Sequence, residues 1–325
     1  MKKEITILTE PITLKSKLKL LAKKILGRQT KYTGHYAVTR SLVEGLEKIG
    51  YEGFNYRPRS EKNIAEHVHV LAGVETLRYA IKLKNEGKIK KLTVGPNVVV
   101  FSTDYDSLIA DESVDLYLQP SQWAVDLHIK MEPKMQGRCV PWPAGVKIED
   151  YEPDKYQKKD KQVIVYHKLG CEQFCYKIAY LLRKYGYHPI IIQYGSYQLQ
   201  DYIKTLGETE FCIALSKLES QGLYLAEAWA MDVPTICFES NYYMWKDGEH
   251  IVEEAENIST CPYLTKETGL RFTELSELEE ILKKMPELQP TFAPRKWVLE
   301  NMTDEVCARQ FLQTVGVKLD REKSV

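Results

Sequence analysis

One segment decides the fold, residues 214–234, which read ALSKLESQGLYLAEAWAMDVP. It contains the end of an apolar run, residues 211–215, which predicts a buried strand. A polar turn carrying Glu219 follows, and a helix is expected over residues 222–231. The next apolar run, residues 234–238, predicts another strand. A strand, a helix and a strand in succession are typical of a parallel α/β layer.

The same alternation of apolar runs and helical patterns continues along both halves of the chain. Predicted strands lie at residues 5–8, 67–71, 92–94, 98–101, 114–118 and 138–141, and then at 163–166 and 188–193. Residues 150–161 are polar and have no apolar rhythm, which indicates a linker. The sequence therefore predicts an N-terminal domain (1–152), a linker (153–161), a C-terminal domain (162–302) and a closing helix (303–325).

Both domains are expected to be Rossmann-like, doubly wound α/β layers that face each other across a cleft. Ligands bind at the carboxyl ends of the strands in such sheets, so we expect the ligand in this cleft. The length of 325 residues suits two domains. Lysine and arginine total 45 and aspartate and glutamate also total 45, so the overall charge gives no indication of nucleic-acid binding. Seven cysteines without a C-x-x-C pair favour a reducing compartment. With no apolar run of membrane-spanning length and no signal peptide, we expect a cytoplasmic protein.

The polar turn and helix start within residues 214–234 suit a phosphate. A helix N-terminus has free backbone N–H groups and the positive end of the dipole, and Gly222 lets a ligand approach the backbone closely. Glu227 lies in the second turn, where it can accept hydrogen bonds from ribose hydroxyls, and Glu219 can hold a sugar. Spacing alone is weak evidence, since two glutamates eight residues apart also arise by chance and the helix has an ordinary apolar face.

This segment resembles the E-x7-E region of the large retaining GT-B glycosyltransferase family, which is glycosyltransferase family 4-like. The usual form of the region is S-x-x-E-G-F-G-L-x-x-L-E-A-M-A-x-G-x-P. It is most similar to a bacterial subgroup with E-S-Q-G-x-x-x-x-E-A-W-A-M. The matching residues are Ser216, Glu219, Gly222, Leu223, Glu227, Ala228, Ala230 and Pro234. Weaker similarity extends to residues 142–146 and 194–197.

The resemblance implies transfer of a sugar from a nucleotide-diphosphate sugar with retention of configuration, as in a hexosyltransferase. The donor would lie in the C-terminal domain and the acceptor, a glycan, lipid or protein, would approach from the N-terminal domain. It implies catalytic roles for Glu219, Lys168 and His69. It implies an acceptor-side role for His35. Residues 95–97 are a predicted turn by composition, and because this turn follows a strand, Asn97 is a further candidate for the acceptor side. The implied donor-binding residues are Gly34, Lys168, Ser220, Gln221, Gly222, Leu223, Glu227, Tyr194 and Gly195.

Two features depart from the family pattern: a cation of the diphosphate site is replaced, and the loop after the first strand has one glycine, Gly34, where two are usual. The family usually has an arginine and, five residues later, a lysine that neutralise the diphosphate, whereas this chain has Lys168 followed by Gln173. Because the leaving diphosphate gains negative charge in the transition state, the loss of one cation weakens the expected stabilisation. The missing cation and the single Gly34 favour one alternative, a non-catalytic binding protein. A sugar-nucleotide epimerase or hydrolase on the same scaffold, which needs a cleft acid to activate water, also stays open.

No dinucleotide fingerprint, P-loop or H-E-x-x-H motif is present, and we expect neither a cofactor nor a metal. Residues 15–31 carry seven basic residues and no acid, interleaved with leucine and isoleucine. Such a segment can rest peripherally on the anionic inner face of a membrane or attract an anionic acceptor. A solvated lysine face packed through its leucines explains the same pattern.

Overall fold

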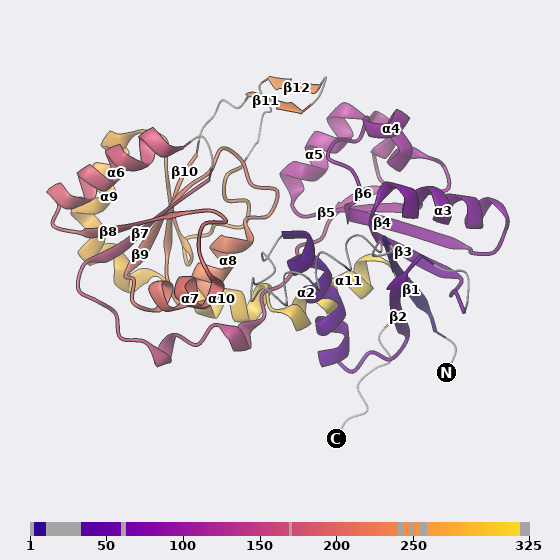
Figure 1. Ribbon diagram of the computed structural model, residues 1–325, viewed down its shortest axis with the longest axis horizontal. Coiled ribbons are helices and arrows are strands. Elements are labelled where there is room, and N and C mark those ends of the chain that lie inside the picture. Colours follow the sequence, from indigo (N-terminus) through magenta and orange to yellow (C-terminus); the bar gives the residue numbers. More distant parts are fainter. Residues whose placement is uncertain are drawn as a thin grey trace, which may run out of the picture. The chain divides into compact units, whose positions relative to one another are not determined.

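The computed structural model describes residues 3–10, 34–59, 63–168, 171–239, 244–247, 250–253 and 259–318. The chain divides into two compact units, one of Met1–Gly145 with Asp304–Val325 and one of Val146–Thr303 (Figure 1). This division differs from the one expected from the sequence: residues 146–161 belong to the second unit, and the closing helix belongs to the first. The basic segment 15–31 lies outside the described residues.

The first unit is a six-stranded parallel sheet with helices on both faces. Its strand order is β2-β1-β3-β4-β5-β6. The strands are β1 (Ile5–Thr9), β2 (Phe54–Pro58), β3 (His67–Ala72), β4 (Lys91–Asn97), β5 (Leu116–Gln119) and β6 (Cys139–Pro141). The helices are α2 (Gly34–Lys48), α3 (Val74–Asn85), α4 (Asp104–Ser107), α5 (Gln122–Met131) and α11 (Asp304–Thr314), with 3-10 turns η1 (Leu108–Ala110) and η2 (Pro133–Met135).

The core of this unit follows from the burial of its central strands. Every residue of β1 except the last is buried, and β3 shows the same pattern. Such strands must be covered on both faces, which is why apolar faces of α3 and α5 pack on one side. On the other side α2 packs against α11, and Arg40 forms an ion pair with the fully buried Asp304. The last helix of the chain is therefore part of the first unit's structure.

Two local expectations in the first unit were wrong, and one strand was not expected. Residues 95–97 continue β4 instead of forming a turn, because Gly95, at φ 106°, runs so close to β5 that a Cβ would overlap the Leu118 carbonyl oxygen. Residues 98–101 do not form a strand, since the Asp104 carboxylate accepts the N–H groups of Val100 and Phe101 and turns the chain into α4. The edge strand β2 was not expected, and its residues are half-buried or exposed.

The second unit is a five-stranded parallel sheet of order β13-β10-β9-β7-β8. The strands are β7 (Gln162–His167), β8 (His188–Gln193), β9 (Phe211–Leu215), β10 (Thr235–Phe238) and β13 (Gly269–Phe272). A separate antiparallel pair is formed by β11 (Met244–Asp247) and β12 (His250–Glu253). The helices are α6 (Glu172–Lys184), α7 (Leu199–Gly207), α8 (Leu223–Ala230), α9 (Leu275–Leu288) and α10 (Pro294–Asn301), with turns η3 (Ile148–Asp150), η4 (Pro153–Lys155) and η5 (Gln289–Thr291).

Alternate residues of β7 divide the interior of the second unit into two layers. Val163 and Val165 point to an apolar layer that includes residues of α6 and α9. Tyr166 points to the opposite layer, where it contacts the rings of Tyr202 on α7 and Tyr224 on α8. This second layer is aromatic and carries hydroxyl groups, so it differs in chemistry from the purely apolar layer and lies next to the site described below.

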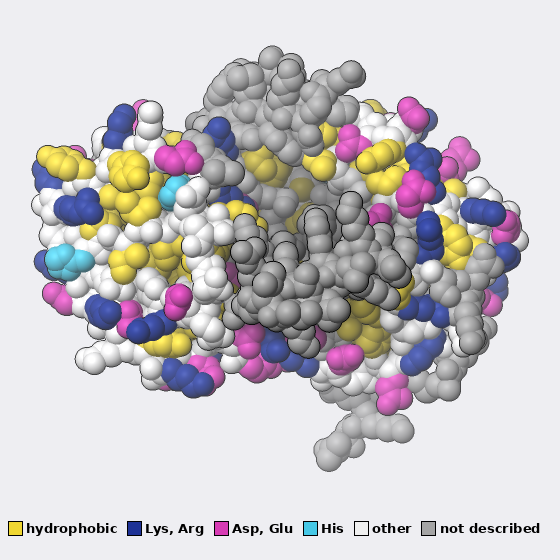
Figure 2. All heavy atoms as spheres, in the orientation of Figure 1, with side chains coloured by type: hydrophobic (Ala, Val, Ile, Leu, Met, Phe, Trp, Pro, Cys, Tyr) yellow, Lys and Arg dark blue, Asp and Glu magenta, His cyan; other side chains and the backbone are white. Residues whose placement is uncertain are grey.

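The surface and the helices give two further facts. On the face drawn in Figure 2, basic and acidic side chains are interspersed over both units, in keeping with equal numbers of basic and acidic residues. Among the helices in the described part of the chain, none combines the length and the apolar character required to cross a bilayer.

Candidate functional site

The carboxyl edge of the second unit's sheet brings together most of the predicted donor-site residues. Lys168 directly follows β7, and its N–H donates to the Leu215 carbonyl at the end of β9. Tyr194 directly follows β8, and its N–H donates to the carbonyl of His167. Because neighbouring parallel strands end together, residues that are far apart in sequence lie at one edge.

Lys168 and Glu219 form the central ion pair of this edge. The Nζ of Lys168 lies 2.7 Å from Oε1 of Glu219 and 2.8 Å from Oε2. The Lys168 side chain is 30% exposed and that of Glu219 is 6% exposed. The Glu219 backbone is held as well, since its N–H donates to the Ser259 carbonyl at 3.0 Å. The carboxylate therefore has a fixed position, and the ammonium group reaches it from the more open side.

Two tyrosine rings surround the same ammonium group. The Nζ of Lys168 lies 4.9 Å from the ring centroid of Tyr194 and 5.6 Å from that of Tyr224. Both distances fall within the range of cation–π attraction. Tyr224 in turn stacks on Tyr166, with centroids 4.2 Å apart and planes 10° from parallel. Lys168 thus contacts one carboxylate and two aromatic rings, a set that we call the Lys168 cluster.

The start of α8 lies beside this cluster. Gly222 is the N-cap residue, with φ 78° and ψ 55°, which is the left-handed region that favours glycine. A Cβ at Gly222 would lie 2.8 Å from Cδ1 of Leu225, so a side chain is disfavoured there by space as well as by φ. Gln221 is buried, Ser220 is exposed and Leu223 is half-buried. The expected helix start with a close-approach glycine is therefore present.

Glu227 lies in α8 and is 7% exposed. Burial raises the pKa of Tyr202 well above its ordinary value, and the negative charge of Glu227 raises it further. Burial also raises the pKa of Tyr166, with Glu227 among the smaller contributions. These tyrosines therefore keep their protons, and the environment of Glu227 is one of neutral hydroxyl groups.

The residues predicted in the first unit are placed differently. Gly34 is the first residue of α2 and His35 the second, and residues 11–33 before them lie outside the described residues. Asn97 is the last residue of β4. His69 lies in the core, with Nδ1 3.0 Å from Oγ1 of Thr93 and its ring 4.8 Å from that of Phe311. Burial lowers the pKa of His69 to about 3, so its ring is neutral near pH 7.

Three residues were not predicted: Tyr224, a member of the Lys168 cluster, and Tyr166 and Ser259, which contact Tyr224 and Glu219 of that cluster. Tyr166 precedes Lys168 by two residues in the chain, so its place near this edge had a readable signal, although the ring that it stacks on is that of Tyr224. Tyr224 looked like an ordinary helix residue, and Ser259 is 40 residues from Glu219, so neither had one. Gln173, which replaces the family's second cation, is exposed in the first turn of α6.

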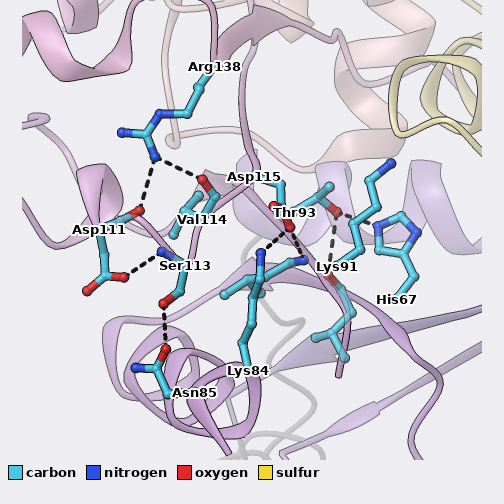
Figure 3. Close-up of polar contacts among 12 residues, drawn as sticks. His67, Lys84, Asn85, Lys91, Thr93, Asp111, Ser113, Val114, Asp115 and Arg138 are labelled. Atoms are coloured by element: carbon cyan, nitrogen blue, oxygen red, sulfur yellow. Dashed lines mark hydrogen bonds and ion pairs between the residues drawn. The ribbon is translucent and has the colours of Figure 1, made fainter. Parts of the chain in front are cut away.

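A hollow of about 420 Å³ lies at the amino edge of the first unit's sheet. Lys3, Glu4, Glu66, His67, Lys90 and Lys91 line it. Figure 3 shows the neighbouring polar contacts, in which Asp115 accepts from Lys84 and from the backbone of Leu92, and His67 contacts Thr93. Two lysines that line the hollow are already engaged, Lys90 by Glu66 and Lys91 by the Val315 carbonyl.

Within the described residues, no group of three or more His, Cys, Asp or Glu side chains is arranged to hold a metal.

No protein-family model and no curated protein matches this chain. Solved structures do. The chain is similar to a glycosyltransferase from Rickettsia africae (TM-score 0.55, 11% identity, 97% of this chain and 98% of that one). It is similar to the lipopolysaccharide outer core galactosyltransferase WaaB (TM-score 0.59, 12% identity, 96% of this chain and 99% of that one). It is also similar to HepE of Anabaena in complex with UDP and glucose (TM-score 0.50, 10% identity, 97% of this chain and 99% of that one). The chain therefore has the two-unit α/β fold of the GT-B glycosyltransferases.

Proposed function

We propose that this protein is a glycosyltransferase whose second unit binds a nucleotide-diphosphate sugar at the carboxyl edge of its sheet. The observation that carries the proposal is the Lys168–Glu219 ion pair beside the glycine-capped start of α8. A cation, a helix N-terminus and a buried carboxylate supply what a phosphate-linked sugar requires: positive partners for the phosphates and an acceptor for hydroxyls.

Each residue then has a specific task. The N–H groups at the start of α8 and the ammonium of Lys168 bind the diphosphate, and they stabilise the charge that it gains as it leaves. Glu219 accepts hydrogen bonds from hydroxyls of the transferred sugar, and Glu227 accepts them from the ribose. Tyr194, Gly195, Ser220, Gln221 and Leu223 line the same edge. Most of the rate enhancement comes from positioning the donor and from this electrostatic stabilisation.

The finer features of the reaction are proposed from the sequence resemblance. Hexosyl transfer with retention of configuration and without a metal follows from the resemblance of residues 216–234 to the E-x7-E family. The presence of UDP and glucose in the HepE structure is in keeping with a nucleotide-sugar donor. A glycan, lipid or protein acceptor would approach the first unit, and Gly34, His35 and Asn97 are the candidates there. Residues 15–31 are the candidate for contact with an anionic membrane surface.

The donor site is tested by isothermal titration calorimetry with UDP, GDP, ADP and CMP, alone and as sugar conjugates. One nucleotide should bind to the wild type. The Lys168→Ala and Glu227→Gln variants should bind it at least tenfold more weakly. Lys177→Ala is the control, since it removes an exposed lysine of α6. Failure of the wild type to bind any of these nucleotides would contradict the proposed function.

The type of reaction is tested by following the identified donor by NMR, first alone and then with acceptor mixtures. A glycosyltransferase consumes the donor mainly when an acceptor is present, and the first anomer formed reports whether configuration is retained. Release of free sugar or of an epimeric donor without an acceptor would favour the hydrolase or epimerase. Binding without any turnover would favour a non-catalytic binding protein.

A further inference from the structure

The Lys168 cluster contains more aromatic contact than an ion pair needs. Lys168 already has both oxygens of Glu219 within 2.8 Å, yet the rings of Tyr194 and Tyr224 also lie within 5.6 Å of its Nζ. A lysine side chain has four rotatable bonds, and fixing it costs up to about 2 kcal/mol of rotamer entropy. Because Gln173 stands where the family has a second cation, the position of Lys168 matters more here than it would in a pair.

Tyr224 is held rigidly from several directions. Its ring stacks on Tyr166, and its backbone carbonyl accepts a hydrogen bond from the Tyr202 hydroxyl at 3.3 Å. The Tyr166 hydroxyl lies 3.1 Å from that of Tyr197, so Tyr166 is itself fixed. Tyr224 is 5% exposed and is the second residue of α8. The ring therefore forms a fixed wall beside the ammonium group.

Tyr194 forms a second, more accessible wall. It is 48% exposed, and its backbone is tied to the end of β7 through the His167 carbonyl. The next residue, Gly195, has φ 76° and turns the chain away directly after the ring. One aromatic wall is thus buried and the other is open to solvent.

We infer that Tyr224 and Tyr194 are positioning residues that keep the Lys168 ammonium beside the start of α8 while it exchanges Glu219 for the diphosphate. The inference rests on the proposed function. Cation–π attraction operates over a ring face out to about 6 Å from the centroid, so the ammonium can exchange a carboxylate for phosphate oxygens while it stays within reach of both rings. The rings thereby offset part of the loss of the second cation. Position 224 is a variable position of the E-x7-E pattern, so the positioning role of Tyr224 is a feature of this chain and not of the pattern.

The experiment measures the affinity of the nucleoside diphosphate that binds the wild type, by calorimetry, for ring-removing and ring-preserving variants. Tyr194→Leu should weaken binding about three- to fivefold and Tyr224→Leu about tenfold or more. Tyr194→Phe and Tyr224→Phe keep the rings and should bind within twofold of the wild type. Tyr180→Leu is the control, because Tyr180 is 74% exposed on α6. If Tyr224→Leu does not fold, the exposed Tyr194 variants still decide the matter.

A double-mutant cycle separates positioning of Lys168 from direct contact with the ligand. In a Lys168→Met background, Tyr194→Leu should have no further effect, because the cation that the ring holds is gone. An equal effect in both backgrounds would overturn the inference, as would wild-type affinity of Tyr194→Leu in the presence of a clear loss for Lys168→Met. Absence of binding by the wild type would instead refute the proposed function, so the two failures are distinguishable.

Discussion

Lys168 contacts both carboxylate oxygens of Glu219, at 2.7 and 2.8 Å. The cation assigned to the diphosphate is thus engaged by the carboxylate assigned to the sugar. Without a donor, each charge neutralises the other at the carboxyl edge of the sheet. In the proposed function, a donor that binds at Lys168 competes with Glu219 for the ammonium group, and the free energy of separating the pair then reduces the apparent affinity for the donor.

The first prediction concerns Glu219→Gln. The neutral amide competes less strongly for Lys168, so bare nucleoside diphosphate should bind up to about fivefold more tightly, in line with about 1 kcal/mol for a partly exposed pair. Transfer of the sugar should fall by at least tenfold, since the amide is a weaker acceptor for sugar hydroxyls. Calorimetry and a donor-consumption assay measure the two effects. Weaker binding of the bare diphosphate would show that the pair does not compete with the ligand.

The second prediction compares two glycines of the second unit. Gly222 and Gly195 have φ values of 78° and 76°, but a Cβ would meet Leu225 at 2.8 Å at Gly222 and nothing within 4 Å at Gly195. Gly195→Ala should therefore cost only the backbone term of about 1 kcal/mol, and Gly222→Ala should cost about 1 kcal/mol more. Urea unfolding followed by tryptophan fluorescence measures both. Equal losses would mean that Leu225 moves aside freely.

Much of the fold was readable from the sequence because its signals are local. Apolar runs of four to six residues between helical patterns predicted most strands of the two parallel sheets correctly. The edge strand β2 was missed because its sequence signal is weak. Gly53 marks the preceding turn and Phe54 is apolar, but no buried apolar run follows, since β2 is half-exposed. The membership of α11 in the first unit was also not readable, since its ion pair to Arg40 joins residues 264 apart in sequence.

The site was readable where one segment carried it. Glu219, Gly222 and Glu227 belong to a single strand–turn–helix unit, so their spacing placed them correctly at the start of α8. Tyr224 and Ser259 could not be identified, because their roles depend on the packing of α8 against β7 and on a backbone contact to Glu219. His69 was selected by the family resemblance from the alternating pair His67 and His69, and its burial could not be read from that alternation.

The third prediction is a loss of stability on acidification. Burial lowers the pKa of His67 and of His128 to about 4 and that of His69 to about 3. The ordinary value in the unfolded chain is about 6.5. Between pH 6.5 and these lower values the unfolded chain binds more protons than the folded protein, so stability falls as the pH falls. The limit for each histidine is about 1.4 kcal/mol per pH unit.

Chemical denaturation at pH 7.0, 6.0 and 5.0 measures this dependence. His67→Gln and His69→Gln should each flatten the curve of stability against pH by roughly one third, because each removes one of three similar contributions. His188→Gln is the control, since His188 is exposed at the start of β8. A curve that neither buried-histidine variant flattens would show that these side chains take up protons in the folded state.

The last prediction restores the missing cation. Gln173 is exposed in the first turn of α6, and α6 is the helix that follows β7 and Lys168 in the chain. A lysine there adds a second positive partner for the diphosphate, opposed by a smaller repulsion from the N-terminal end of the helix dipole. Gln173→Lys should therefore tighten nucleoside-diphosphate binding by about three- to tenfold, and the gain should shrink at high salt. Gln313→Lys adds the same charge on α11 in the first unit and should leave binding unchanged. A gain shared by both variants would reflect overall charge, whereas no gain for Gln173→Lys would mean that residue 173 does not face the phosphates.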